Sequence, residues 1–185
     1  MALLPIVKWP AAVLETKAKP VSEFNDEIKQ FVDDMHETMN KERGIGMAAN
    51  QVNRLLRVIV INIAHYDRPD ENGEIEELKW WHNKRLTFIN PEIVTKDGRE
   101  RSVEGCLSFP EVYEWVDRAK HVIVRAQDVD GTSFDTDADG LLAVCVQHEI
   151  DHIDGIVFTS RMSRLKSAMV KKKMMKRRSQ RENEA

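Results

Sequence analysis

The chain has 185 residues, of which 42% are hydrophobic and 32% are charged, and its formal net charge is -3. This size suits one domain, residues 1–185. No run approaches the roughly 18 apolar residues of a membrane span, and the first ten residues resemble neither a signal peptide nor a transit peptide, so we expect a cytoplasmic protein without a membrane partner. Two cysteines, Cys106 and Cys145, are too few for a disulfide framework.

In chain order, the first predicted element is a helix over residues 25–41, because apolar side chains recur there at helical spacing and Gly44 follows as a stop signal. Four β-rich runs separated by turn-forming residues come next, at 57–63, 86–93, 113–116 and 121–126. Residues 64–85 are polar, acidic and aperiodic as far as Trp80 and Trp81, and we interpret them as a long surface loop.

Two more helices are predicted in the C-terminal part of the chain. Asp139 offers an N-cap and Gly155 a stop for a helix over residues 141–154, and a last helix covers about 163–176. The order helix, strands, helix, helix is typical of an α+β domain. We therefore expect twisted antiparallel or mixed β-sheets packed around the helix at 141–154, with a basic C-terminal helix and tail from about residue 160.

The predicted helix at 141–154 carries the pattern His-Glu-x-x-His, formed by His148, Glu149 and His152. Residues four apart on a helix lie one above the other, so the two imidazoles can close on one metal ion. Glu149 then lies where a general base for hydrolysis is needed. The alternative is a solvated helix that carries two unrelated histidines.

A catalytic metal takes three protein ligands and leaves a position for water. No histidine follows Gly155, so the third ligand must come from elsewhere in the chain. Cys106 is the stronger candidate, because Gly105 lets the backbone approach closely and a thiolate binds divalent ions well. Cys145 lies one turn before His148, and we interpret it as part of a pocket wall. For either cysteine, the alternative is a small buried hydrophobic residue.

Three sequence blocks resemble, in the same order, the three signature motifs of peptide deformylases. They are Gly-Ile-Gly-Met-Ala-Ala-Asn-Gln at 44–51, Glu-Gly-Cys-Leu-Ser at 104–108 and Gln-His-Glu-Ile-Asp-His at 147–152. The likeness extends over most of residues 3–165. It implies a metal-dependent hydrolase that removes the formyl group from N-formylmethionine at the N-terminus of nascent polypeptides and releases formate.

The resemblance also implies roles for individual residues. The implied metal ligands are Cys106, His148 and His152. Glu149 would be the catalytic acid and base, while the Gln51 side chain and the Leu107 N–H would stabilise the oxyanion. One thiolate and two imidazoles suggest Zn²⁺ on geometry alone. The resemblance instead implies Fe²⁺, which Ni²⁺ or Zn²⁺ can replace.

Substrate contacts are expected from all three motifs and from the helix face that precedes His148. A formyl group needs a cramped space beside the metal, and Gly44 and Gly46 suit it. The methionine side chain needs apolar walls, although Leu141 and Val144 can equally be ordinary core residues. The residues expected to bind substrate are Gly44, Ile45, Gly46, Glu104, Gly105, Leu141, Val144 and Cys145.

Two features bear on partners. Tyr113 stands where many bacterial relatives have an arginine, so its contact with the substrate is expected to differ. The basic run at 171–178 is either a solvated helix end or, as in similar enzymes, a contact with ribosomal RNA near the exit tunnel. No DNA partner is expected.

Two other functions remain open on the sequence alone. A zinc endopeptidase built on the same helix would cleave internal peptide bonds and would not need Cys106. A catalytically silent relative that binds ribosomes would have lost Gln51, Glu149 or a metal ligand, and all of these residues are present.

Overall fold

The computed structural model describes residues 2–63 and 84–184. The loop predicted at 64–85, with Trp80 and Trp81, therefore lies outside the described residues except for its last two positions. The elements are η1 (Ala12–Glu15), α1 (Asp26–Lys41), β1 (Gly46–Ala48), η2 (Ala49–Val52), β2 (Val58–Ile61), β3 (Leu86–Asp97), β4 (Glu100–Cys106), β5 (Phe109–Arg118), β6 (His121–Gln127), β7 (Ser133–Asp139), α2 (Gly140–Ile153), η3 (Phe158–Arg161) and α3 (Arg164–Glu184).

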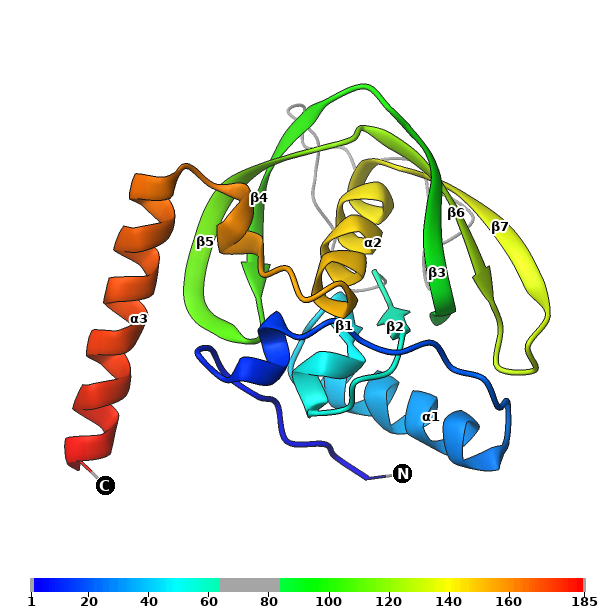
Figure 1. Cartoon of the computed structure of the whole chain (residues 1–185), viewed down its shortest axis with the longest axis horizontal. Coiled ribbons are helices and arrows are strands. Elements are labelled where there is room, and N and C mark those ends of the chain that lie inside the picture. Colours follow the sequence, from blue (N-terminus) through cyan, green and yellow to red (C-terminus); the bar gives the residue numbers. More distant parts are fainter. Residues whose placement is uncertain (1, 64–83, 185) are drawn as a thin grey trace.

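The strands form two antiparallel sheets. A five-stranded sheet has the order β1-β2-β3-β6-β7, and β4 pairs with β5 in a separate two-stranded sheet. Figure 1 shows α2 in the middle of the molecule, with β6 and β7 on one side and β4 and β5 on the other. The predicted α+β class with a central metal-motif helix is confirmed, and the described sheet pairings are all antiparallel.

Helix α2 is buried almost all round. Every residue from Leu142 to Ile153 is buried, as expected for a helix whose sequence is apolar on most faces. Its apolar residues share one core cluster with Ile59 and Ile61 of β2 and with Val122 and Val124 of β6. The histidines and the glutamate of α2 are therefore held in a water-poor interior.

Helix α1 packs against the opposite side of β2. The Asn25 side chain accepts a hydrogen bond from the Ile28 N–H (3.1 Å) and so caps the helix. Met35 and Met39 are fully buried in a second cluster with Val58 and Val60. Since side chains alternate along a strand, the valines of β2 pack in the cluster with α1 and its isoleucines pack in the cluster with α2.

Helix α3 is longer than predicted and runs alongside β5 (Figure 1). Val170 and Met174 are buried in a third cluster with Phe109 and Phe158, whereas Leu165 and Met169 are exposed. No helix in the described part of the chain is long and apolar enough to cross a membrane.

Candidate metal centre and active site

The cysteine and the two histidines predicted as ligands come together at the C-terminal end of β4 and on one face of α2. The Sγ atom of Cys106 lies 3.2 Å from Nε2 of His152, and the ring centroids of His148 and His152 are 5.0 Å apart. One ligand atom from each of the three residues lies within 4.8 Å of the other two. Cys106 and Cys145 are both free thiols.

The donor atoms fit a divalent transition metal. Nδ1 of His148 lies 2.7 Å from Oε2 of Glu104, so its Nε2 is left for an ion, as is usual for imidazole ligands. Burial lowers the pKa of His152 well below its ordinary value, so this ring is neutral. Burial would also lower the pKa of His148, but its hydrogen bonds with Cys106 and Glu104 outweigh this and raise the pKa well above its ordinary value, so His148 has to release a proton when it binds an ion. A thiolate with two imidazoles is a set that binds such ions well.

A network of buried charges holds His148 in place. Two nitrogens of Arg118 donate to the carboxylate of Glu104 at 2.7 and 2.9 Å, and a third donates to Asp151. Burial alone would raise the pKa of Glu104, but the hydrogen bonds from Arg118 and His148 outweigh it and lower the pKa to about 2. Glu104 is therefore ionised, and His148 donates its Nδ1–H to it. Arg161 donates to the same Asp151 carboxylate.

Glu149 faces the backbone of β1 at very short range. A Cβ atom added to Gly46 would lie 2.5 Å from Oε1 of Glu149. The other carboxylate oxygen, Oε2, is buried and has no hydrogen-bond partner among the described residues. Burial raises the pKa of Glu149 to about 7, and the charge of Glu104 adds to the rise while His148 opposes it. Such a carboxyl group can both accept and release a proton near neutral pH.

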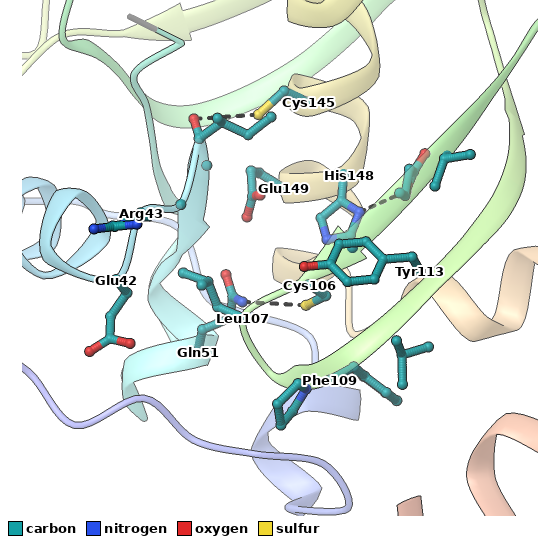
Figure 2. A pocket seen from close by; sticks show the side chains of 18 of the residues that line it. Glu42, Arg43, Gln51, Cys106, Leu107, Phe109, Tyr113, Cys145, His148 and Glu149 are labelled. Atoms are coloured by element: carbon teal, nitrogen blue, oxygen red, sulfur yellow. Dashed lines mark hydrogen bonds and ion pairs between the residues drawn. The ribbon is translucent and has the colours of Figure 1, made fainter. Parts of the chain in front are cut away.

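The Gln51 side chain is fixed with its amide nitrogen toward the cysteine. Its Oε1 accepts a hydrogen bond from the Ala48 N–H (2.9 Å), while Nε2 lies 3.5 Å from Sγ of Cys106 and 3.3 Å from Oγ of Ser108. Figure 2 shows Gln51 directed at Cys106, and Glu149 beside His148 on the helix. Lys8 donates to the carbonyl oxygen of Leu107 (2.7 Å).

A cavity of about 560 Å³ joins these groups. Its lining includes all eight residues predicted to bind substrate: Gly44, Ile45, Gly46, Glu104, Gly105, Leu141, Val144 and Cys145. The lining also includes Gln51, Cys106, Leu107, His148 and Glu149. His152 is almost fully buried.

Sequence reasoning missed several residues of the cavity wall. They include Lys8, Glu42, Arg43, Phe109 and Val112. Lys8 lies in the N-terminal segment, and its contact with the cavity could not be predicted because it depends on tertiary folding and not on a local sequence pattern. Glu104 was expected at the substrate, but its carboxylate is engaged by Arg118 and His148. Tyr113, which stands where many bacterial relatives have an arginine, also lines the cavity, so this sequence difference lies at the site.

Comparison with known proteins gives one consistent family. The model of the polypeptide deformylase family matches residues 3–168. A peptide deformylase of Chromobacterium violaceum is 47% identical over 97% of this chain and 99% of its own length. The crystal structure of a peptide deformylase from Legionella pneumophila covers 97% of this chain and 98% of its own with a TM-score of 0.81 at 37% identity. A peptide deformylase from Ehrlichia chaffeensis, solved in complex with actinonin, has a TM-score of 0.83 at 34% identity and covers 96% of this chain and 98% of its own.

Proposed function

This chain belongs to the polypeptide deformylase family, and on that premise we propose which of its residues hold the metal, bind the substrate and move the proton. Enzymes of this family remove the N-formyl group from nascent peptides, and this chain is a peptide deformylase by that membership. The residue assignments rest mainly on the convergence of Cys106, His148 and His152. Two of these residues, Cys106 and His148, line a cavity that Gln51 and Glu149 also line.

The three converging residues would hold one divalent ion. When bound there, the ion supplies Lewis acidity, which polarises the formyl carbonyl and lowers the pKa of water. The His148 ring is aimed by Glu104, and the neutral His152 ring needs no loss of a proton to bind. Three protein ligands leave room for water and substrate, as in other catalytic sites.

Glu149 moves the proton. Its Oε2 has no partner among the described residues, so it is available to accept a hydrogen bond from the attacking water. Glu149 takes one proton as the oxygen of water bonds to the formyl carbon, and it delivers that proton to the methionine nitrogen as the carbon–nitrogen bond breaks. The products are formate and a peptide with a free amino terminus.

Two N–H groups stabilise the negative oxygen of the tetrahedral species. The Gln51 amide is oriented by the hydrogen bond from the Ala48 N–H, and its Nε2 is directed toward Cys106 and Ser108, beside which the oxyanion would form. The backbone N–H of Leu107, which follows Cys106, is the second donor. Removing one such donor typically costs about a hundredfold in rate or more.

The substrate binds as an extended strand between two open sheet edges. Strand β1 is the last strand of its sheet, and β4 is paired only with β5, so each has one unpaired edge among the described strands. Residues of both strands line the cavity. A peptide placed between them gains main-chain hydrogen bonds on both sides. The methionine side chain then lies against Leu141, Val144 and Cys145.

Formate release from formyl-Met-Ala-Ser tests the activity and its base. The protein is loaded anaerobically with Fe²⁺ or Ni²⁺ and compared with Glu149→Gln at equal metal content. The wild type should release formate, the variant should lose about a thousandfold or more in kcat, and the acetylated peptide should remain intact. Cleavage of internal peptide bonds would instead support the zinc endopeptidase, and metal-replete protein without turnover would support the catalytically silent relative.

We propose Fe²⁺ as the physiological metal, supported by the family resemblance and by a thiolate ligand set that also accepts Ni²⁺ and Zn²⁺. Aerobic purification should then lower the activity and yield a zinc-loaded or oxidised centre, measured by metal analysis beside the turnover rate. Equal and stable activity of the iron and zinc forms in air would contradict this assignment.

We also propose that the enzyme works in the cytoplasm and contacts the ribosome through α3. The free thiols suit a reducing compartment, and Lys172, Lys173 and Lys176 are exposed on the helix. Since Val170 and Met174 are buried, deleting residues after Ser167 would also uncover the core. Reversing the three lysines to glutamate is therefore the cleaner test, and it should weaken co-sedimentation with ribosomes at low salt while formate release is retained. Unchanged sedimentation would reject the contact.

A further inference from the structure

Three consecutive residues near the N-terminus, which we call the N-terminal strap, form hydrogen bonds with both segments that carry the proposed oxyanion donors. The N-terminal strap consists of Val7, Lys8 and Trp9. The Val7 N–H donates to the carbonyl oxygen of Gln51 in η2 (2.7 Å). The Trp9 N–H donates to the carbonyl oxygen of Ser108 (3.0 Å), and the Lys8 ammonium donates to that of Leu107 (2.7 Å). The strap therefore links η2 to the turn between β4 and β5.

The contacts with this turn restrain the segment that carries one of the two donors. Leu107 and Ser108 are the two turn residues between β4 and β5. The carbonyl groups of a turn need partners outside the strand ladder, and the strap supplies a donor to both of them. Because a peptide unit is planar and the chain rotates only about φ and ψ, holding these carbonyls also limits the rotation of the Leu107 N–H.

The second donor is tied to the same turn. The Gln51 Nε2 lies 3.3 Å from Oγ of Ser108, although the two residues are 57 positions apart. Both residues are almost fully buried. The backbone contacts of the strap and this side-chain contact thus close a ring of interactions that runs through the strap, η2 and the turn. The relative position of the two donors depends on all three segments.

The N-terminal strap is itself anchored on the protein core. The Trp9 ring stacks on Phe109 with the ring centroids 5.8 Å apart, and the fully buried Phe109 meets the edge of Phe158 at 5.3 Å. The ammonium of Lys171 in α3 lies 5.6 Å from the centroid of the Trp9 ring. Lys8, in contrast, is exposed and lines the cavity. Its side chain can therefore be changed without removing part of the core.

We propose that the N-terminal strap is a positioning element of the reaction, which holds the Gln51 amide and the Leu107 N–H in the relative position that stabilises the oxyanion. Lys8 is the positioning residue whose side chain carries this role. The inference rests on the proposed function, because it concerns the oxyanion formed there. Donors aimed in advance at a developing charge need no reorganisation during the reaction, and this is the source of their effect on rate.

Lys8→Met tests the side-chain contact, because it removes the ammonium and keeps a linear side chain. In metal-loaded enzyme, kcat for formyl-Met-Ala-Ser should fall about tenfold, a part of the hundredfold that a whole donor is worth. KM should change by less than about twofold, because the oxyanion exists only in the transition state. Lys8→Arg can still donate and should keep at least about a third of the wild-type kcat. Lys29→Met removes an equal charge from an ion pair with Asp130 (2.6 Å) and should leave kcat unchanged.

The backbone contact with η2 is tested by an exchange of one atom. Replacing Val7 by the matching α-hydroxy acid removes the N–H that donates to Gln51 and keeps the side chain. This change should also lower kcat by about tenfold. The matched control is the same exchange at Leu4, whose N–H donates to Oγ1 of Thr38 (2.9 Å). It should lower the unfolding free energy in urea by a similar amount and leave kcat unchanged.

Hydrogen exchange reports the positioning without turnover. Followed by NMR in the zinc-loaded protein, exchange of the Leu107 amide should be about fivefold faster in Lys8→Met than in the wild type or in Lys29→Met. If formate is released and neither kcat nor this exchange responds to Lys8→Met, the strap proposal is overturned and the proposed function stands. An equal loss of kcat in Lys29→Met or in the Leu4 control would show a general effect of charge or stability and would also overturn it. Exchange that responds while the wild type releases no formate would support the positioning of Leu107 by the strap and refute the proposed function alone.

Discussion

Gly46 leaves room for Glu149, the proposed general base, beside the place where water would attack, and replacing Gly46 by alanine tests this role. The added Cβ would lie 2.5 Å from Oε1 and 2.9 Å from Cδ of Glu149, and 2.7 Å from Sγ of Cys145. Ordinary van der Waals contact begins at 3.4 Å. Glu149 would therefore have to retreat by about 0.9 Å, the difference between 3.4 and 2.5 Å.

The expected loss in Gly46→Ala follows from this displacement. A misplacement of about 1 Å in a reacting group costs on the order of a hundredfold in rate, so kcat/KM for formyl-Met-Ala-Ser should fall about a hundredfold. Overpacking of the site should also cost about 1–3 kcal/mol of unfolding free energy. Because neither Gly46 nor Glu149 is among the three clustered ligand residues, the metal content should stay near one ion per chain.

Gly44→Ala is the matched control. Its Cβ would meet Cδ1 of Leu107 at 2.8 Å and Cγ of Met39 at 3.3 Å, and the nearer atom is the flexible end of a side chain. We expect a loss of less than about fivefold in kcat/KM, because the Leu107 backbone and Glu149 stay in place. The assay is formate release at measured metal content, with urea unfolding beside it. A Gly46→Ala enzyme that kept its metal and more than a third of the wild-type kcat/KM would refute the reasoning.

Three further predictions concern stability and metal. Burial lowers the pKa of His36 from 6.5 to about 4. As the pH falls from 6.5 toward 4, the unfolded chain is therefore protonated at His36 before the folded chain is, and the unfolding free energy decreases. About 2 kcal/mol should disappear between pH 7 and 5, and urea unfolding of His36→Gln should lack that loss. Arg161→Met should lower the unfolding free energy by about 2 kcal/mol, because the buried carboxylate of Asp151 loses a partner, and an equal midpoint in urea would contradict this. Chelation should abolish activity and lower the thermal midpoint, because the bound ion stabilises the folded chain by up to about 4 kcal/mol when it is present at a thousand times its Kd. Adding Ni²⁺ should restore both the activity and the midpoint in the wild type but not in Cys106→Ser.

The helices could be predicted because their signals are local. The helix expected at 25–41 is α1 (Asp26–Lys41), with Asn25 as its cap, and the one expected at 141–154 is α2 (Gly140–Ile153). Asp139 occupies the N-cap position without a side-chain cap hydrogen bond, and Gly155 follows with a positive φ of 74°. Correct helical phase was enough to bring His148 and His152 to one face.

The strands β1, β4 and β7 were not predicted, because their sequences carry little of the alternation between apolar and polar residues that indicates a strand. In β7 the acids Asp135, Asp137 and Asp139 are exposed while Thr136 and Ala138 are buried, so the inward face has little hydrophobic contrast. Strand β4 has few apolar residues because its inward side buries the charge of Glu104, and β1 is only three residues long. Alternation is the main sequence signal of a strand, and it is weak in all three.

The charge network around His148 could not be predicted from sequence for a different reason. Glu104, Arg118 and Asp151 lie on three different elements, and each is of a residue type that is usually found at the surface. All three side chains are nevertheless at most 8% exposed. Their burial is tolerable because each charge meets an opposite one with good hydrogen bonds, and a single unpaired member would cost several kcal/mol. Since the network ends on Nδ1 of His148, the pairing that makes these charges stable in the interior also fixes the direction in which the ring presents its other nitrogen. The sequence motif predicts which residues bind the metal, and the surrounding fold determines how their side chains are oriented.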